Sequence, residues 1–400
     1  MKIGIIREEK NPPDSRVPLN PVQCRALMNE YPIEIVVAPS PTRCFKDDEY
    51  IAEGIKIQDD LRDCEVLMGV KEVPPSALIP NKTYFFFSHT IKKQPYNRNL
   101  LQTILKKNIQ LIDYEVLTND EGQRLIAFGV FAGMVGAHNG VMTYGRRMGS
   151  FDLPRMNSFF DYAAAKQAYG ERQLPNFRTV LTGTGRVASG AAKVLEDMGI
   201  QKVSPKDYLA NNYKKPVFTQ LACQDYVSRK DGEAFDTNEF YQHCSKFKSV
   251  FLPYACKSDL MINGIYWDNS APAFFSLEEM CQSGFGIKVI ADVTCDIAPV
   301  ASIPATIKAS TIADPIFGFD PITGKECLPH QPNVIDMMTI DNLPNELPRD
   351  ASTSFGQQFS EHIISALMDK ENSPIIQRAS ITMGKKLGPN FKYLTDYVGF

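Results

Sequence analysis

The sequence predicts an α/β protein with two Rossmann-like domains, in which parallel sheets are flanked by helices and a cleft lies between the domains. Two observations favour this fold. Short apolar runs alternate with helix-like runs on both sides of the middle of the chain, and strands that alternate with helices form mostly parallel sheets covered on both faces. A glycine-rich turn at Gly183–Val187 also joins an apolar run to a helix-like run, which is typical of a dinucleotide-binding domain.

The first block shows the alternation most clearly. Apolar runs typical of buried strands cover Met1–Ile6, Ile33–Val37, Val66–Val70, Thr83–Phe87 and Gln110–Ile112. Runs typical of helices cover Pro21–Tyr31 and Asn97–Lys107. This order predicts a parallel sheet with helices on its faces.

The middle of the chain continues the pattern. Ala127–Arg147 is rich in Ala, Gly, Val and Met, which predicts a closely packed connecting helix. A second alternating block runs from about Arg178 to Asp314. Its later strands are expected at Val217–Ala222, Ser249–Leu252 and Lys288–Asp292.

The tail of the chain decides how the domains are assembled. It contains one helix-like run, Ser354–Met368, and is too short to form a domain, so we expect it to fold back onto the first block. We therefore expect a substrate and catalytic domain made of residues 1–135 plus 337–400. Residues 136–336 are expected to form the dinucleotide-binding domain.

The composition excludes several classes of function. The 400 residues carry a net charge of −3, whereas nucleic-acid binding asks for a basic patch. No apolar run approaches the roughly 18 residues that cross a bilayer, and the first apolar run is cut short at Arg7, which argues against a signal peptide. The nine cysteines include no C-x-x-C pair, so we expect reduced thiols in a cytoplasmic protein, without disulfides or a metal site.

The glycine turn is predicted to hold the pyrophosphate of a dinucleotide. Gly183 permits a tight turn, and Gly185 lets the backbone approach the phosphates. The helix that follows offers free N–H groups and the positive end of its dipole, and the small Ala188 lets that helix pack close to the strand. The residues assigned to the cofactor on this basis are Gly183, Thr184, Gly185, Arg186 and Val187. The alternative is a tight strand-to-helix turn that binds no nucleotide.

Two strands of the first block end in residues that can transfer protons. Lys71 follows the strand at 66–70, and His89 follows the strand at 83–87. If these strands are parallel neighbours, both residues lie at the sheet edge where open α/β sheets bind ligands. A lysine that is partly desolvated beside a histidine and the positive nicotinamide ring has a lowered pKa, and it can act as an acid or base near neutral pH. The alternatives are a solvated lysine and a hydrogen-bonded histidine.

Other charged residues are candidates for binding. Arg16 follows the first strand, and its guanidinium suits a substrate carboxylate. A surface salt bridge is the alternative, and the same choice applies to Glu115 and Arg124. The segment Asp292–Asp296 ends a late strand, so its acids either face the nicotinamide ribose or cap a turn.

Segments spread in unbroken order over nearly the whole chain carry a more specific resemblance. They are Arg16–Pro21, Gly69–Glu72, Lys82–Lys92, Leu111–Glu115, Ala127–Gly129, Thr182–Gly185, Ile262–Trp267 and Ile340–Pro344. On these segments the chain resembles the lysine–oxoglutarate reductase module of the bifunctional aminoadipic semialdehyde synthases. More broadly, it resembles the L-lysine-forming saccharopine dehydrogenases and the alanine dehydrogenases. The bifunctional proteins carry a second enzyme after this module, and because the chain ends at Phe400 we expect that activity to be absent.

The resemblance implies a reaction between L-lysine and 2-oxoglutarate. The ε-amine condenses with the ketone to an imine, which takes hydride from a reduced nicotinamide to give saccharopine, and the reverse direction oxidises saccharopine. By matched position, Lys71 is implied to serve the proton that moves with the hydride step, and His89 the addition and loss of water. The residues implied to line the substrate site are Arg16, Lys92, Glu115, Arg124 and Phe128. Asp296 is implied to lie beside the nicotinamide and its ribose.

The second strand of the dinucleotide domain bears on the choice between NAD and NADP. NAD enzymes usually place an acid at the end of this strand, and NADP enzymes often place an arginine nearby. Cys223 stands where that arginine would be expected, and Asp225 is a shifted acidic candidate, which favours NAD. Arg229 and Lys230 leave NADP open.

Two other functions remain open on the same residues. The first is another amino-acid or imine dehydrogenase, such as one acting on alanine and pyruvate, because Lys71, His89 and Arg16 would serve both. Extra cations such as Lys92 and Arg124, turned inward, would favour the longer dicarboxylate substrate. The second is a dinucleotide-sensing or assembly protein without turnover, which the intact Lys71 and His89 disfavour. The expected partners are small amino acids and 2-oxo acids, and the oligomeric state is left open.

Overall fold

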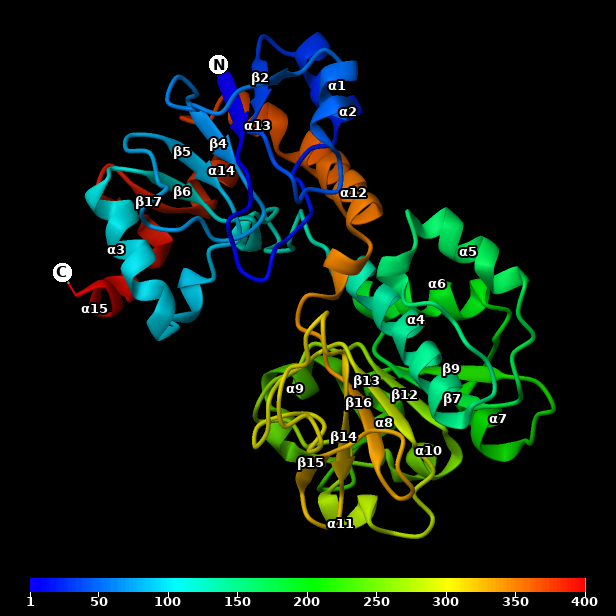
Figure 1. Cartoon of the computed structure of the whole chain (residues 1–400). Coiled ribbons are helices and arrows are strands. Elements are labelled where there is room, and N and C mark those ends of the chain that lie inside the picture. Colours follow the sequence, from blue (N-terminus) through cyan, green and yellow to red (C-terminus); the bar gives the residue numbers. More distant parts are fainter. Residues whose placement is uncertain (400) are drawn as a thin grey trace. The chain divides into compact units, whose positions relative to one another are not determined.

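The computed structural model describes residues 1–399, which fold into two compact units. The first unit comprises residues 1–128 together with those from 348 onward, and the second comprises residues 129–347. Each unit contains an eight-stranded, mostly parallel sheet with helices packed beside it (Figure 1). The predicted α/β class with two mostly parallel sheets is therefore confirmed.

The sheet of the first unit has the strand order β18-β17-β6-β5-β4-β1-β2-β3. Its strands are β1 (Lys2–Ile5), β2 (Glu34–Val37), β3 (Lys56–Ile57), β4 (Val66–Met68), β5 (Thr83–Phe85), β6 (Gln110–Ile112), β17 (Ser380–Met383) and β18 (Lys386–Leu387). The strands from β1 to β6 pair in parallel, and β17 joins β6 antiparallel. The tail of the chain thus returns to the first sheet, with β17 beside β6 in Figure 1.

Helices cover this sheet, and their ends follow local sequence signals. Helix α1 (Pro21–Glu30) begins with a capping box, in which the Asn20 side chain accepts the Gln23 N–H and the Gln23 side chain accepts the Asn20 N–H. Such a box satisfies two otherwise unpaired donors at a helix start. The other helices of the unit are α2 (Asp47–Ala52), α3 (Arg98–Lys106), α12 (Pro348–His362), α13 (Ile364–Met368), α14 (Pro374–Ala379) and α15 (Thr395–Val398). No helix within residues 1–399 is both long and apolar enough to cross a membrane.

The sheet of the second unit has the order β15-β14-β16-β13-β12-β7-β9-β8. Its strands are β7 (Arg178–Thr182), β8 (Gln201–Val203), β9 (Val217–Leu221), β12 (Leu260–Asn263), β13 (Val289–Asp292), β14 (Ile316–Asp320), β15 (Lys325–Cys327) and β16 (Ile335–Met338). Strand β7 lies between β9 and β12 and is parallel to both. The strand order reverses at β7, and such a switch point is where doubly wound sheets bind their ligands.

One predicted strand of this unit is wrong. Phe247–Ser249 forms β11, which pairs antiparallel with β10 (Val227–Arg229) in a separate two-stranded sheet. Helix α10 (Leu252–Lys257) then begins where the strand Ser249–Leu252 was expected to end. Pro253 occupies the first turn of this helix, where its missing N–H costs no hydrogen bond. The fully buried core strands β12 and β16 were missed by the prediction.

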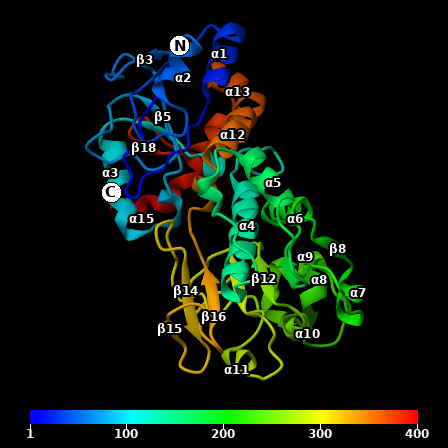
Figure 2. The ribbon, with the colours of Figure 1, turned by 45° about the vertical axis from the view of Figure 1, so that its right-hand side comes forward.

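Glycines allow two helices of the second unit to touch through their backbones. Helix α4 (Gly129–Met148) runs alongside α6 (Arg186–Asp197) (Figure 2). A Cβ on Gly133 would lie 1.7 Å from the carbonyl oxygen of Val187, and a Cβ on Gly190 would lie 2.0 Å from that of Val130. The contact therefore excludes every side chain at Gly133 and Gly190.

A Gly190→Ala variant is expected to lose about 3 kcal/mol of unfolding free energy, the upper end of the usual cost of overpacking. The added methyl meets the backbone of α4, so the helices must separate. Chemical denaturation, followed by far-UV circular dichroism, measures the loss. The matched control is Gly170→Ala at the end of α5 (Tyr162–Gly170), where a Cβ meets no atom within 4 Å. Equal stabilities of the two variants would contradict the close contact.

The limits of the units follow from this helix pair. The whole of α4 packs in the second unit, against α6 and β13. Glu346, near the other limit, is fully buried and bonds Arg155 Nη2 at 2.5 Å and Asn139 Nδ2 at 3.1 Å. The units thus change over at 128/129 and 347/348, whereas the sequence-based expectation put the changes at 135/136 and 336/337.

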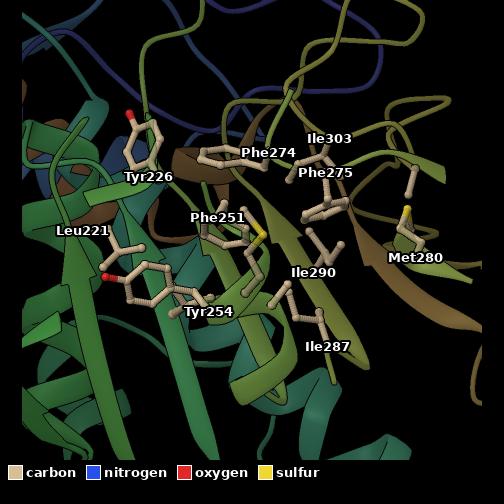
Figure 3. Close-up of a cluster of buried hydrophobic side chains, with 14 of the residues drawn as sticks. Leu221, Tyr226, Phe251, Tyr254, Phe274, Phe275, Met280, Ile287, Ile290 and Ile303 are labelled. Atoms are coloured by element: carbon tan, nitrogen blue, oxygen red, sulfur yellow. The ribbon is translucent and has the colours of Figure 1, made fainter. Parts of the chain in front are cut away.

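An aromatic cluster forms much of the core of the second unit (Figure 3). The rings of Phe251 and Phe274 are 4.9 Å apart between centroids, and that of Tyr226 lies 5.0 Å from Phe274. Leu221, the last residue of β9, and Ile290 of β13 join the cluster. Burial of such large side chains is a main source of stability, and here it holds the carboxyl end of β9 in place.

Candidate active site

The two proton-transfer candidates lie at one sheet edge of the first unit. Strands β4 and β5 are parallel neighbours, as the sequence argument required. The ladder continues past their ends, because the Phe87 N–H donates to the Val70 carbonyl at 3.0 Å. Lys71 directly follows Val70, and His89 lies two residues after Phe87. The structure therefore brings both to the carboxyl edge of the same sheet.

Lys71 is half-buried, and its backbone is held by an acid that the sequence argument did not single out. The Lys71 N–H donates to Glu8 Oε2 at 2.9 Å. Burial lowers the pKa of the Lys71 amine below its usual value, and the nearby positive charge of Arg16 lowers it further. A cavity of about 320 Å³ within this unit opens beside Lys71 and Glu72.

His89 is tied to the residue that follows Lys71. Its Nδ1 lies 2.5 Å from Glu72 Oε1, and Lys10 Nζ lies 3.0 Å from Glu72 Oε2. Burial alone would raise the pKa of Glu72, but the hydrogen bond and the charge of His89 bring it down to about 2. Because an ionised Glu72 accepts from Nδ1–H, Nε2 of His89 is the atom that can take up or release a proton.

Asp113 anchors the loop that carries His89. His89 has a left-handed backbone, with φ of +53°, which is uncommon outside glycine and is sustained by surrounding contacts. The fully buried Asp113 accepts the Ser88 N–H at 2.8 Å and the Ser88 hydroxyl at 2.6 Å, and it also accepts the Glu115 N–H at 2.7 Å. Its side chain thus joins the His89 loop to the Glu115 loop. The sequence contained a signal for this, an acid directly after β6, but not the partner.

Three of the predicted substrate-lining charges, Lys92, Glu115 and Arg124, meet in one group. Glu115 Oε1 lies 3.6 Å from both Lys92 Nζ and Arg124 Nη2. The Arg124 guanidinium also lies over the ring of Phe87, 5.7 Å from its centroid. Two cations therefore share one carboxylate at the edge that carries His89.

Arg16 does not form the surface salt bridge that was one of its two expected alternatives. Only 4% of its side chain is exposed, and its Nε and Nη2 bond the buried Asp14 at 3.0 and 2.6 Å. It is thus part of a buried ion pair and not a surface salt bridge. Its guanidinium lies 4.3 Å from the ring centroid of Phe128, which stacks on Phe355.

The glycine turn of the second unit has the geometry of a phosphate loop. Gly183 has φ of +99°, and a Cβ there would lie 2.7 Å from the carbonyl oxygen of Gly264. Gly185 is the N-cap of α6 and makes no side-chain cap, and a Cβ on it would meet no atom within 4 Å. The space around the Cα atom of Gly185 is therefore open, and the first N–H groups of α6, those of Arg186 and Val187, come directly after it in the chain. These residues fit the pyrophosphate of a dinucleotide.

The acids near the ends of β9 and β13 mainly serve turns. Asp225 Oδ2 accepts the Ala222 N–H at 2.7 Å and so starts the short helix α8 (Cys223–Tyr226). Asp292 is fully buried, accepts the Cys295 N–H of the following turn at 3.2 Å, and also accepts from Asn263 Nδ2 at 2.9 Å and from the Thr306 hydroxyl at 2.6 Å. Of the two alternatives given for the acids of this segment, Asp292 therefore caps a turn. Asp296 lies at the end of the same turn.

Within residues 1–399 no group of three or more side chains that could ligate a metal ion is found.

Comparison with known proteins shows which proteins the chain is similar to. Residues 4–135 match the model of the alanine dehydrogenase/PNT N-terminal domain. Over 98% of its length the chain is 31% identical to the alpha-aminoadipic semialdehyde synthase of Arabidopsis thaliana, of which it covers 41%. The mitochondrial protein of that name from Mus musculus is 27% identical, with 47% covered. The chain thus spans less than half the length of these relatives.

Two further comparisons cover whole proteins. A saccharopine dehydrogenase (NAD(+), L-lysine-forming) of Emericella nidulans is 25% identical, over 96% of this chain and 96% of that protein. The solved structure of an L-alanine dehydrogenase covers the whole of both chains with a TM-score of 0.67 at 15% identity, a likeness of fold.

These findings show the fold of the chain and the proteins that it is similar to. The mostly parallel eight-stranded sheets have a fold like that of an L-alanine dehydrogenase, and residues 4–135 match the N-terminal domain of the alanine dehydrogenase/PNT family. Over nearly its whole length the chain is similar in sequence to the L-lysine-forming saccharopine dehydrogenases and the alpha-aminoadipic semialdehyde synthases.

Proposed function

We propose that this protein catalyses the nicotinamide-dependent condensation of L-lysine with 2-oxoglutarate to saccharopine, or the reverse reaction. The names of the relatives support this substrate pair. The observation that supports the proposal is that a lysine with a lowered pKa lies at the same sheet edge as the hydrogen-bonded pair of Glu72 and His89. Imine chemistry requires a neutral amine and groups that move protons in both directions.

Lys71 and His89 divide the proton transfers in this proposal. The Lys71 amine, being easier to deprotonate than a solvated lysine, takes or gives the proton that accompanies the hydride step at the substrate nitrogen. Nε2 of His89 serves the addition and loss of water at the carbon. Glu72 holds the His89 ring through Nδ1 and stabilises the imidazolium when it forms.

The charged group around Glu115 suits a substrate with carboxylates at its ends. Lys92 and Arg124 provide two cations at one carboxylate, so a substrate carboxylate can replace part of their contact with Glu115. Arg16 and Phe128 form the adjoining wall. Because the Arg16 fork is already bonded to Asp14, we infer that it acts on the substrate mainly through its charge and its fixed position.

The second unit is proposed to bind the dinucleotide, with NAD favoured and NADP left open. Gly183, Thr184, Gly185, Arg186 and Val187 would hold the pyrophosphate, and Asp225 and Asp296 would contribute at the riboses. When bound, the nicotinamide supplies or accepts the hydride. No arginine stands at the end of β9, which supports NAD. Nine unpaired cysteines support a cytoplasmic location as part of the proposal.

The purified protein is expected to oxidise NADH when lysine and 2-oxoglutarate are both present, and not when either is omitted. Nicotinamide absorbance follows the reaction, and the product is identified by mass spectrometry. The matched assays use pyruvate with ammonia in place of the two substrates, and NADPH in place of NADH. Turnover only with pyruvate and ammonia would replace the proposal with an alanine dehydrogenase-like activity. Tight dinucleotide binding without turnover of any pair would indicate a sensor.

A further inference from the structure

We propose that Glu8 is a positioning residue for Lys71. The ionised side-chain carboxylate of Glu8 holds the backbone segment that carries the Lys71 amine, and the protonated carboxyl releases that segment. The inference rests on the proposed function in one respect only, namely that the position of Lys71 matters for turnover. Glu8 lies three residues after β1, in the charged run Arg7–Lys10. Its contacts, and not its place in the sequence, single it out.

The carboxylate of Glu8 is seated in a cradle made by three consecutive residues. Oε1 accepts the Val70 N–H at 2.5 Å, and Oε2 accepts the Lys71 N–H at 2.9 Å. Gly69 makes the approach possible, since a Cβ there would lie 3.1 Å from Glu8 Oε1 and 2.7 Å from the Ile6 side chain. Both oxygens of one acid thus fasten the end of β4 at the point where Lys71 leaves the sheet.

The cradle makes the grip of Glu8 depend on its charge. An ionised carboxylate accepts from both N–H groups, whereas a protonated one carries a hydroxyl on one oxygen and loses an acceptor. The enclosed position of the carboxylate raises the pKa of Glu8 to about 7, although the hydrogen bonds from Val70 and Lys71 favour the charged form. Both forms are therefore populated near neutral pH.

Other charged and titratable groups face Glu8 from the surrounding segments. Asp14 raises the pKa of Glu8, and Arg16 lowers it. The buried Tyr114 also feels the charge of Glu8. Since Asp14 and Arg16 also act on the Lys71 amine, Glu8 and Lys71 share one electrostatic environment. As the pH rises through about 7, Glu8 becomes ionised, and its hold on the Lys71 backbone becomes complete.

The test compares Glu8→Gln with Glu9→Gln. Glu9 is the adjacent residue, is exposed, and pairs with Arg7 at 3.5 Å, so it is a matched control. Glu8→Gln offers an amide N–H to one backbone N–H, which breaks one contact and keeps the size. We expect kcat to fall by about 10- to 100-fold, the usual range for a displaced catalytic group, with KM nearly unchanged. The wild-type rise of kcat through about pH 7 is expected to be lost as well.

A second measurement needs no turnover. The carbonyl stretch of a protonated carboxyl is separate from those of ionised carboxylates in the infrared spectrum. The wild type and Glu9→Gln are expected to lose one such band as the pH rises through about 7, and Glu8→Gln is expected to lack it. Hydrogen exchange in peptides covering residues 66–72 is expected to be faster in Glu8→Gln. If that variant does not fold, Glu8→Asp, which keeps the charge but is too short to reach both N–H groups, takes its place in the kinetic and hydrogen-exchange measurements.

The outcomes separate the two proposals. A Glu8→Gln variant with wild-type kcat and pH profile, or with the same infrared band and exchange as wild type, would overturn the role of Glu8. A wild type inactive with lysine and 2-oxoglutarate would instead overturn the proposed function. In that case the infrared and exchange measurements still decide whether Glu8 holds the Lys71 segment.

Discussion

A Lys71→Met variant is expected to bind the dinucleotide like the wild type and to lose about 10²- to 10⁴-fold in kcat, the usual contribution of a general acid or base. Methionine has a similar length and suits the half-buried position, and it keeps the backbone N–H that donates to Glu8. What it removes is the amine, whose pKa is lowered by burial and by Arg16. The chemical step is thus tested without disturbing the fold.

The measurement is kcat with the best substrate pair, together with a fluorescence titration of NADH. Lys56→Met is the matched control, because Lys56 is exposed on β3 at the far edge of the same sheet. Equal kcat for Lys71→Met and wild type would remove the assignment of Lys71 as a catalytic residue. Loss of NADH binding in this variant would show that the residue supports the fold or the cofactor instead.

A Gly185→Val variant is expected to fold normally and to bind the dinucleotide at least about 100-fold more weakly, which corresponds to about 2.8 kcal/mol. Gly185 has φ of −81° and ψ of −167°, an extended conformation that valine adopts without strain. The new side chain meets no protein atom near its Cβ. It therefore occupies the open space over the N-terminus of α6, where we expect the pyrophosphate to approach.

The dinucleotide titration is paired with thermal unfolding of the protein without ligand. Gly170→Val serves as the control, since Gly170 also has no neighbour within 4 Å of a Cβ and lies in the same unit. A normal titration for Gly185→Val would refute the assignment of this turn to the cofactor. A lowered melting temperature shared by both variants would trace any effect to helix ends and not to the phosphate loop.

Much of the fold could be predicted because its signals are local. The apolar runs of β1, β4 and β5 and the capping signal before α1 lie within a few residues of the elements they specify. The strand predicted at Ser249–Leu252 was wrong for the same reason. A short apolar run fits a strand or a helix start, and only packing against Phe274 and its neighbours settles Phe251 at the start of a helix.

The candidate site was predicted in part. The types of residue at the ends of β4 and β5 indicated Lys71 and His89, and the structure places both at one edge. Glu8 and Asp113 were missed because their sequence surroundings do not show what they bind. Glu8 lies in a run of charged residues, and Asp113 is a single acid after a strand, and neither pattern indicates a hydrogen-bond partner. The burial of Arg16 with Asp14 was likewise beyond local inference, since exposure depends on what the rest of the chain places over a residue.

The amino-acid sequence alone determined the alternation of strands and helices, the glycine turn and the chemical groups that follow the strands, because each depends on neighbours along the chain. The tertiary structure decided which of those groups meet. Glu8 reaches Val70 across 62 residues, and Asp113 reaches Ser88 across 25. These contacts exist only because the order β6-β5-β4-β1 places their strands side by side, and the order of strands in a sheet is set by packing of the whole unit.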